Sequence, residues 1–127
     1  MTTLALGQNT TVEVISAYAA TNQQLAAVAV APAWEIIGAF WMPREASVSL
    51  DIIGSVTLAG VQMKGRLFDV ADAVPVSGSD TAIIDGTVDE RQFSGAFLLP
   101  GGKLYQIQAQ VIGSISHFGI VRSSSLF

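Results

Sequence analysis

The chain has 127 residues, half of them apolar and only 13% charged, with six Lys and Arg against ten Asp and Glu. This length suits one domain with a core of its own, and the lack of cysteine excludes disulfides, thiolate metal sites and a thiol nucleophile. The net charge of −4 disfavours nucleic acid as a partner, because only Lys64 and Arg66 among the scattered cations can share a strand face.

The low charged fraction also suggests that neighbouring molecules cover part of the surface. The first residues, Met1 to Leu4, lack the basic start of a signal peptide. No stretch reaches the roughly 18 apolar residues of a membrane-spanning helix. We therefore expect neither nucleic acid nor a membrane as a partner.

The N-terminal region carries weak strand signals behind an arm without a pattern. Residues 1–9 show little periodicity and are interpreted as an N-terminal arm, ahead of one domain over residues 10–127. Residues 11–19 contain several β-branched side chains and are expected to form a strand. Residues 22–31 fit either a helix that ends before Pro32 or a strand, and their short length and alternation favour the strand.

The central part shows the strongest alternation of apolar and polar residues, which places successive side chains on opposite faces of a sheet. Residues 34–42 form an almost continuous apolar run, typical of a strand covered on both faces. Residues 48–58 alternate, and Gly54 interrupts them, which indicates a bulge or a bend. Residues 61–70 alternate in the same way.

The C-terminal half continues as short strands between turns rich in glycine and proline. A short strand is expected at 81–84, alternating strands at 93–99 and 105–111, and a closing strand at 118–122. Turns are expected at 59–60, 74–80, 85–86 and 100–103. About eight short strands at this spacing predict an all-β, antiparallel β-sandwich of the jelly-roll type.

Side chains that support catalysis are scarce. His117 is the only histidine, and no Gly-x-Ser-x-Gly elbow accompanies it, so a catalytic Ser–His pair is not expected. A glycosidase needs two carboxyl groups that face one cleft, and the spacing of the acids does not indicate such a pair. We therefore predict a protein that is not an enzyme and that uses no cofactor.

Acidic residues occur in the expected loops, where calcium ligands usually lie. Asp69 and Asp72 flank one loop, and Asp80 and Asp85 flank another. The Asp-x-Asp-x-Asp-Gly order of a calcium loop is absent, so solvated acids are the simpler interpretation and no metal site is assigned. The Gly-Gly-Lys sequence at 101–103 lacks the rest of a phosphate loop and is interpreted as a hairpin turn.

Two tryptophans are candidates for an exposed aromatic patch. Trp34 and Trp41 are seven residues apart, so an uninterrupted strand would point them to opposite faces. At most one of them then belongs to the core of a two-layer sandwich, and the other lies at a surface or a subunit contact. An exposed tryptophan can pack against a protein or stack on a sugar.

The two ends of the chain supply further contact candidates. Three serines at 123–125 precede Leu126 and Phe127, which we interpret as a tail that docks on a neighbouring subunit. The interface residues predicted from the ends and from the tryptophans are Leu4, Leu6, Trp34, Trp41, Leu126 and Phe127.

One hairpin resembles a known group of virion proteins. Residues 93–105 have the sequence FSGAFLLPGGKLY, a strand, a Pro-Gly-Gly-Lys turn and an alternating strand that begins at tyrosine. This pattern in the C-terminal third resembles small jelly-roll proteins of tailed-phage virions, including head decoration (cement) proteins and fibre domains. The resemblance implies a homotrimer or another symmetric oligomer that clamps major-capsid subunits, and it implies no catalytic residues.

Two functional hypotheses follow. The first is a non-enzymatic virion protein that oligomerises and cements a phage capsid by binding the major capsid protein. The alternative is a carbohydrate-binding β-sandwich module that uses an exposed tryptophan, with or without calcium. A stable trimer in solution favours the first hypothesis and a monomer the second, while a small β-sandwich enzyme lacks a catalytic constellation.

Overall fold

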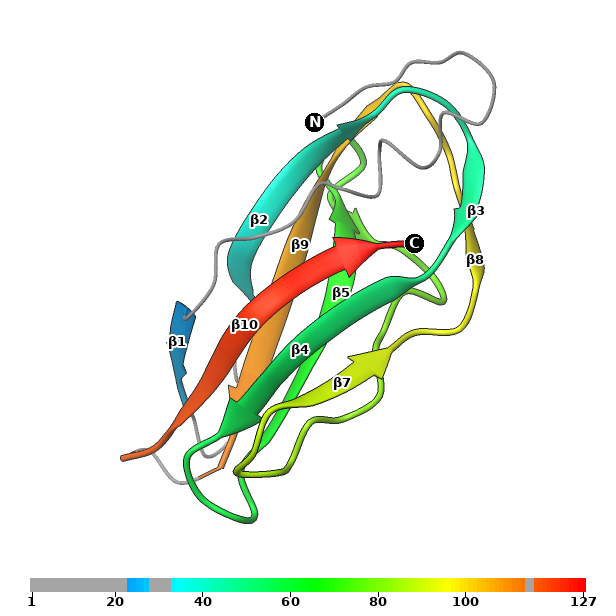
Figure 1. The fold of residues 1–127 in the computed structure, drawn as a ribbon. Helices are drawn as coiled ribbons and strands as arrows, with labels where there is room; N and C mark the ends of the chain where they lie inside the picture. The colour runs from blue at the N-terminus through cyan, green and yellow to red at the C-terminus, as the bar shows by residue number, and fades with distance from the viewer. Residues whose placement is uncertain (1–22, 28–32, 114–115) are drawn as a thin grey trace.

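The computed structural model describes residues 23–27, 33–113 and 116–127. All regular structure within these residues is β, which confirms the predicted all-β class (Figure 1). The strands are β1 (Gln23–Ala26), β2 (Glu35–Met42), β3 (Ala46–Val48), β4 (Leu50–Val56), β5 (Gln62–Asp69), β6 (Val74–Pro75), β7 (Glu90–Phe93), β8 (Phe97–Leu99), β9 (Lys103–Ile112) and β10 (Phe118–Leu126).

Two four-stranded sheets face each other, and all their strand pairs are antiparallel. One sheet has the order β1-β10-β4-β7 and the other β2-β9-β5-β6, while β3 and β8 form a separate two-stranded ribbon. The chain passes directly from one sheet to the other between β1 and β2, β4 and β5, β6 and β7, and β9 and β10 (Figure 1). It also crosses from β2 to β4 through β3 and from β7 to β9 through β8. Eight strands exchanged in this way form a jelly roll, so the predicted sandwich is confirmed.

The core lies between the sheets and is filled by alternate side chains of the long strands. In β5, for example, every second residue is buried, because successive side chains point to opposite faces. Tyr105 is fully buried, and its hydroxyl donates a hydrogen bond of 2.7 Å to the carbonyl of Pro100. The largest fully buried side chains are Tyr105, Met42, Leu50, Ile52, Met63, Leu67, Ile84, Leu99, Ile107, Leu126, Val48 and Val56.

Two predicted strands are each divided in the structure. The run 48–58 breaks at Ser49 into β3 and β4, and the run 93–99 breaks into β7 and β8. The break has a hydrogen-bonding cause, because the Leu50 N–H donates to the Ser94 hydroxyl and the Ser94 N–H donates to the Leu50 carbonyl, both at 2.9 Å. Beyond this contact the two segments leave the four-stranded sheet and pair with each other as the β3-β8 ribbon.

The strand predicted at 81–84 is wrong, because this segment is irregular and only Ile84 makes a bridge, with Met63. Two N–H groups of β5 bond here to side-chain hydroxyls instead of to backbone carbonyls. The Leu67 N–H donates to the Ser79 hydroxyl at 2.9 Å, and the Gly65 N–H donates to the Thr81 hydroxyl at 3.0 Å. The segment therefore covers the edge of β5 and protects its backbone groups from pairing with another chain.

The irregularity expected at Gly54 is present, but the extra residue belongs to the partner strand. The register of β10 shifts between Val121 and Ser123, opposite Gly54 and Ile53 of β4. A Cβ atom at position 54 would lie 2.3 Å from the carbonyl oxygen of Ile120, so only glycine permits this close approach.

Of the ambiguous stretch 22–31, residues Gln23–Ala26 form strand β1, as the alternation favoured. The predicted arm at 1–9 and the predicted strand at 11–19 lie outside the described residues. Within the described ranges no helix has the length and apolar character needed to cross a membrane.

Candidate functional site

The outward side of the β2-β9-β5 sheet carries a group of exposed apolar side chains. Trp41 and Leu104 stand opposite each other on β2 and β9, and Trp41 is 59% exposed. Ile36 on β2 and Ile112 on β9 extend the group along the same two strands. We call these four residues, Ile36, Trp41, Leu104 and Ile112, the apolar face.

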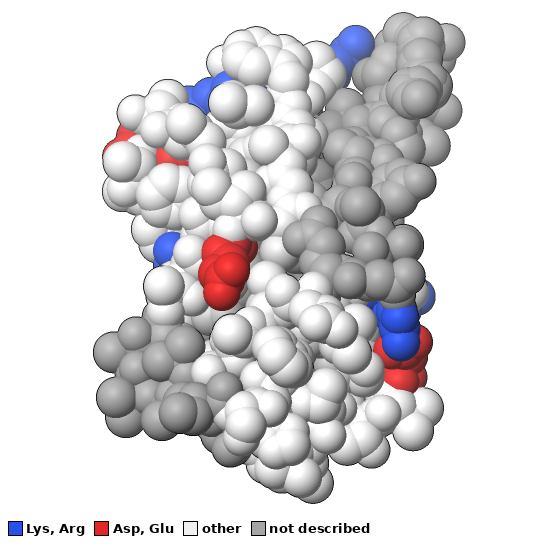
Figure 2. Space-filling view, turned by 90° about the vertical axis from the view of Figure 1, so that its left-hand side faces the viewer, with Lys and Arg blue, Asp and Glu red and all other residues white. Residues whose placement is uncertain are grey.

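Charged groups are sparse around one flank of this sheet. Figure 2 views the molecule from the side where Figure 1 shows β1 and β2, and most of the surface drawn there is uncharged, with a few separate Lys, Arg, Asp and Glu side chains. This appearance agrees with the charged fraction of 13%. Such a surface has a low desolvation cost when another molecule covers it.

A polar network lies between the apolar residues. Gln106, Gln108 and Arg66 form a chain of hydrogen bonds, from Arg66 Nε to Gln108 Oε1 at 2.9 Å and from Gln108 Nε2 to Gln106 Oε1 at 3.0 Å. The guanidinium carbon of Arg66 lies 4.1 Å from the ring centre of Trp34 and 5.6 Å from that of Phe68. Partial burial lowers the pKa of Arg66, which nevertheless remains charged at neutral pH.

The two tryptophans occupy the same outer side of the sandwich, not opposite sides as predicted. The prediction assumed an uninterrupted strand, but the register of β2 against β9 shifts between Ile36 and Gly38. Trp34, which precedes the strand, therefore lies over Arg66 and is half-buried, while Trp41 is exposed. Neither tryptophan belongs to the core, and only the ring of Trp41 is widely open to solvent.

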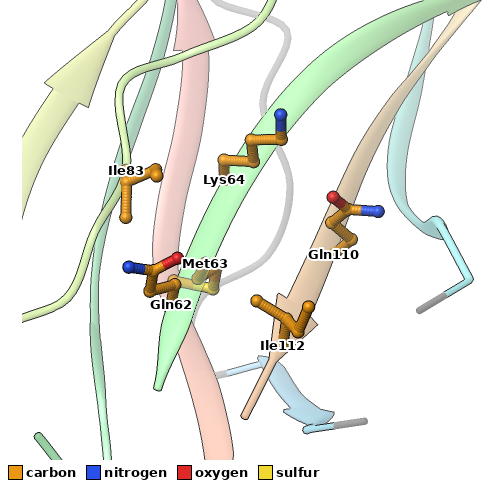
Figure 3. Close-up of a pocket in the computed structure, with 6 residues that line it drawn as sticks. All are labelled: Gln62, Met63, Lys64, Ile83, Gln110 and Ile112. Carbon is orange, nitrogen blue, oxygen red and sulfur yellow. The ribbon is translucent and has the colours of Figure 1, made fainter. Parts of the chain in front are cut away.

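A shallow hollow of about 190 Å³ lies at one end of the same sheet face (Figure 3). Its rim is part apolar, from Ile83 and Ile112, and part polar, from two glutamines and the Lys64 ammonium. Lys64 also makes an ion pair of 3.5 Å with Asp80. The lining residues are Gln62, Met63, Lys64, Ile83, Gln110 and Ile112.

A second surface cluster lies on the outward side of the other sheet. The Arg91 Nε atom donates to Asp51 Oδ2 at 2.8 Å, and the guanidinium lies 5.1 and 5.2 Å from the rings of Phe93 and Phe127. Those two rings contact each other edge to face, with 6.0 Å between their centres. Asp51 Oδ1 is the one buried side-chain oxygen or nitrogen among the described residues that has no hydrogen-bond partner.

The six sequence-predicted contact residues therefore separate into four groups, of which the half-buried Trp34 is one. Trp41 and Phe127 are exposed, at 59% and 48%, and are available for contacts. Leu126 is fully buried in the core, so its assignment to a docking tail is wrong: position 126 falls on the inward side of β10, and Leu126 pairs with Leu50 of β4. Leu4 and Leu6 lie outside the described residues.

Sequence reasoning missed Ile36, Leu104 and Ile112, although a signal for two of them was present. The alternation of 105–111 directs Tyr105 and Val111 inward, so the neighbouring positions 104 and 112 must point outward. Apolar residues at those outward positions depart from the alternating pattern. That departure marks them as exposed apolar residues rather than core residues.

Two of the loop acids that suggested calcium, Asp69 and Asp72, are bound by one lysine. The Lys103 ammonium lies 2.7 Å from Asp69 Oδ2 and 2.8 Å from Asp72 Oδ2. Across the described part of the chain, no three His, Cys, Asp or Glu side chains gather in a way that could hold a metal ion. His117 Nδ1 lies 3.3 Å from the hydroxyl of Thr57, and this contact links the end of β4 to the start of β10.

This cluster makes stability depend on pH in a defined direction. The hydrogen bond from Lys103 holds the pKa of Asp69 below its ordinary value of 3.8, and the same contact raises the pKa of Lys103. The Asp69 contribution to stability is therefore complete above the unfolded pKa and is lost as the pH falls through the lower folded pKa, while the Lys103 contribution is lost only at strongly alkaline pH.

We expect the melting temperature to fall between about pH 5 and pH 2, and part of this fall to come from Asp69. An Asp69→Asn variant should melt below the wild type at pH 7 and should lose less stability on acidification. Circular dichroism melts at several pH values measure both effects. Parallel curves for the two proteins would contradict the assignment.

Comparisons with known proteins give a limited result. No family model matches the chain, and no curated protein matches it. Among solved structures, the chain is similar to the Eiger TNF structure from S. frugiperda, with 9% sequence identity and a TM-score of 0.42. The match covers 84% of this chain and 90% of that one.

Proposed function

We propose that this protein is a non-enzymatic structural subunit of a tailed-phage virion, which assembles with copies of itself and binds the major capsid protein or another virion protein. The observation that carries the proposal is the apolar face, where an exposed Trp41 stands beside Leu104 on a paired sheet. Tryptophan is enriched among the residues that dominate binding energy at protein interfaces.

The supporting structure around Trp41 is rigid. Strand β2 is paired with β9 along its length, and β9 is also paired with β5, so the apolar face is preorganised. A preorganised surface loses little conformational entropy when it binds, and most of the gain from apolar burial is therefore retained. A surface of this kind suits a permanent contact between subunits.

The virion component of the proposal rests on two features. The sequence pattern at 93–105 that resembles phage decoration proteins corresponds to the end of β7, strand β8 and the turn into β9. The jelly-roll topology is the fold of that group. A small sandwich with exposed apolar side chains on both outer sides can contact a lattice and its own copies at the same time.

The proposal is tested by the oligomeric state of two variants. Trp41→Ser and Leu104→Ser should dissociate the assembly or weaken it by at least about tenfold, because each removes apolar area from the proposed contact. Size exclusion with light scattering across a dilution series measures the mass. Leu98→Ser is the matched control, since Leu98 is 61% exposed on β8, outside the apolar face.

A monomeric wild type at all concentrations would contradict self-assembly. An oligomer that tolerates both Ser variants would locate the contact elsewhere. Binding to the capsid is tested separately, by immunogold labelling of phage particles with an antibody against the chain. Unlabelled particles would contradict the virion role.

Carbohydrate binding is the second candidate, and the open ring of Trp41 is the observation that favours it. Trp34 is unsuited to stacking on a sugar, because Arg66 lies 4.1 Å from the centre of its ring. Saturable quenching of tryptophan fluorescence by oligosaccharides, abolished in Trp41→Ala, would support the sugar-binding alternative. We expect no such quenching.

A further inference from the structure

The hollow beside β5 combines apolar walls with a polar rim that includes one ammonium group. Ile83 and Ile112 supply its apolar walls, and both are exposed, at 43% and 37%. Figure 3 shows Lys64 on the same stretch of β5 as Gln62, with Gln110 and Ile112 on the neighbouring strand. An ammonium group and two amides can supply several hydrogen-bond donors at the rim of this hollow.

The charge around the hollow is unusual for this protein. The chain as a whole has a net charge of −4, yet Lys64 and Arg66 occupy successive outward positions of β5. Both cations lie against Trp34, with Lys64 Nζ at 5.9 Å from the ring centre. Asp80, 3.5 Å from Lys64 Nζ, offsets one of these two positive charges. A net positive charge therefore remains beside the hollow, and such a charge attracts a carboxylate.

The loop at 85–90 has the complementary character. Val88 is 78% exposed, which makes it the most exposed large apolar side chain of the described residues. Two carboxylates, Asp85 and Asp89, flank it within the loop. Asp89 makes an exposed ion pair of 3.1 Å with Arg122, whereas Asp85 has no ion pair among the described residues.

Hydrogen bonds to the Glu90 carboxylate hold this loop in a defined conformation. Glu90 Oε2 accepts hydrogen bonds from the N–H groups of Gly86 at 2.8 Å and Asp85 at 3.2 Å. The Gln92 amide donates to the other oxygen of Glu90 at 2.9 Å. These bonds lower the pKa of Glu90 and hold its carboxylate within the loop. Asp85, by contrast, is exposed, so its carboxylate is accessible to another molecule.

We propose that the 85–90 loop of a second copy of this chain docks in the hollow, with Val88 between Ile83 and Ile112 and with Asp85 against Lys64. This inference rests on the proposed self-assembly and adds the pairing of surfaces within it. Each copy carries both the hollow and the loop. It can therefore insert its loop into one neighbour and receive the loop of a neighbour in its own hollow, as every subunit of a closed symmetric oligomer must.

A charge exchange tests the pairing directly. Lys64→Glu and Asp85→Lys should each weaken self-association by about tenfold or more, because each places like charges across the contact. An equimolar mixture of the two variants should associate again, because every contact between one variant and the other pairs opposite charges at positions 64 and 85. Recovery should be complete in a ring with an even number of subunits and partial in a trimer, where one contact always joins identical variants. Sedimentation velocity over a concentration series measures association, and melting curves confirm that each variant is folded.

Two further variants separate this contact from general effects. Val88→Ser should weaken association without lowering stability, because Val88 is 78% exposed in the single chain. Arg44→Glu changes the charge by the same amount as Lys64→Glu at an exposed site between β2 and β3, and it should leave association unchanged.

The outcomes distinguish this inference from the proposed function. An oligomer that is weakened by Trp41→Ser but is indifferent to Lys64→Glu, Asp85→Lys and Val88→Ser overturns the loop-in-hollow pairing and leaves self-assembly standing. A wild type that is monomeric throughout overturns both. Recovery in the mixture of the two charge variants supports the pairing.

Discussion

Replacing Gly101 by alanine is expected to destabilise the protein by about 3 kcal/mol or more. A Cβ atom at position 101 would lie 2.2 Å from the Cα atom of Arg44 and 2.6 Å from the backbone nitrogen of Glu45. Both are backbone atoms, so no change of rotamer relieves the collision. The turn before β9 would have to move away from the connection between β2 and β3.

That movement would spread into the core. The next residue, Gly102, donates its N–H to the Met42 carbonyl at 2.6 Å, and Pro100 accepts the hydrogen bond of the buried Tyr105 hydroxyl. Gly95→Ala is the matched control, because a Cβ atom there meets nothing within 4 Å. Urea unfolding should show the control within about 1 kcal/mol of the wild type. A Gly101→Ala protein of equal stability would contradict the packing described for this turn.

Shortening Leu126 to alanine is expected to lower the free energy of unfolding by about 2–5 kcal/mol. Leu126 is fully buried near the end of β10, opposite Leu50 of β4, so the change leaves a cavity in the core. The strand itself should survive, because the N–H of Phe127 still donates to the Ser49 carbonyl at 3.0 Å. Denaturant unfolding monitored by tryptophan fluorescence measures the loss.

Phe127→Ala is the control for that experiment. The Phe127 ring is 48% exposed, and its contacts with Phe93 and with the Arg91 guanidinium lie at the surface, so its removal should cost less than about 1.5 kcal/mol. The two neighbouring residues thus have separate roles, Leu126 in the core and Phe127 at the surface. If the alanine variants cost the same, the inward position of Leu126 in β10 is wrong.

Much of the fold could be predicted because alternation directly reports which side chains face the core. Residues 61–70 and 105–111 alternate cleanly, and both became long strands of one sheet, as β5 and β9. The strand predicted at 81–84 failed for a reason that alternation does not contain. There the hydroxyls of Ser79 and Thr81 accept the N–H bonds of β5 that a strand would otherwise take.

The candidate contact residues were harder to predict because they depend on register. Trp34 and Trp41 were expected on opposite faces, and one shift of pairing in β2 placed both on the same side. Leu126 looked like part of a polar tail, since three serines precede it, but Ser124 is buried beside it on the same inward side of β10. A sequence pattern gives the period of a strand but not the position of a bulge.

The pairing of β1 with β10 also has a consequence for synthesis of the protein on the ribosome. Gln23 pairs with Val121, so strands from near the two ends of the chain lie side by side, and β10 also separates β1 from β4 (Figure 1). The β1-β10-β4-β7 sheet therefore cannot close until β10 has left the exit tunnel, long after β1. We expect nascent chains that stop before β10 to expose the inner face of the sandwich and to depend on chaperones, since pairing of distant segments is slow.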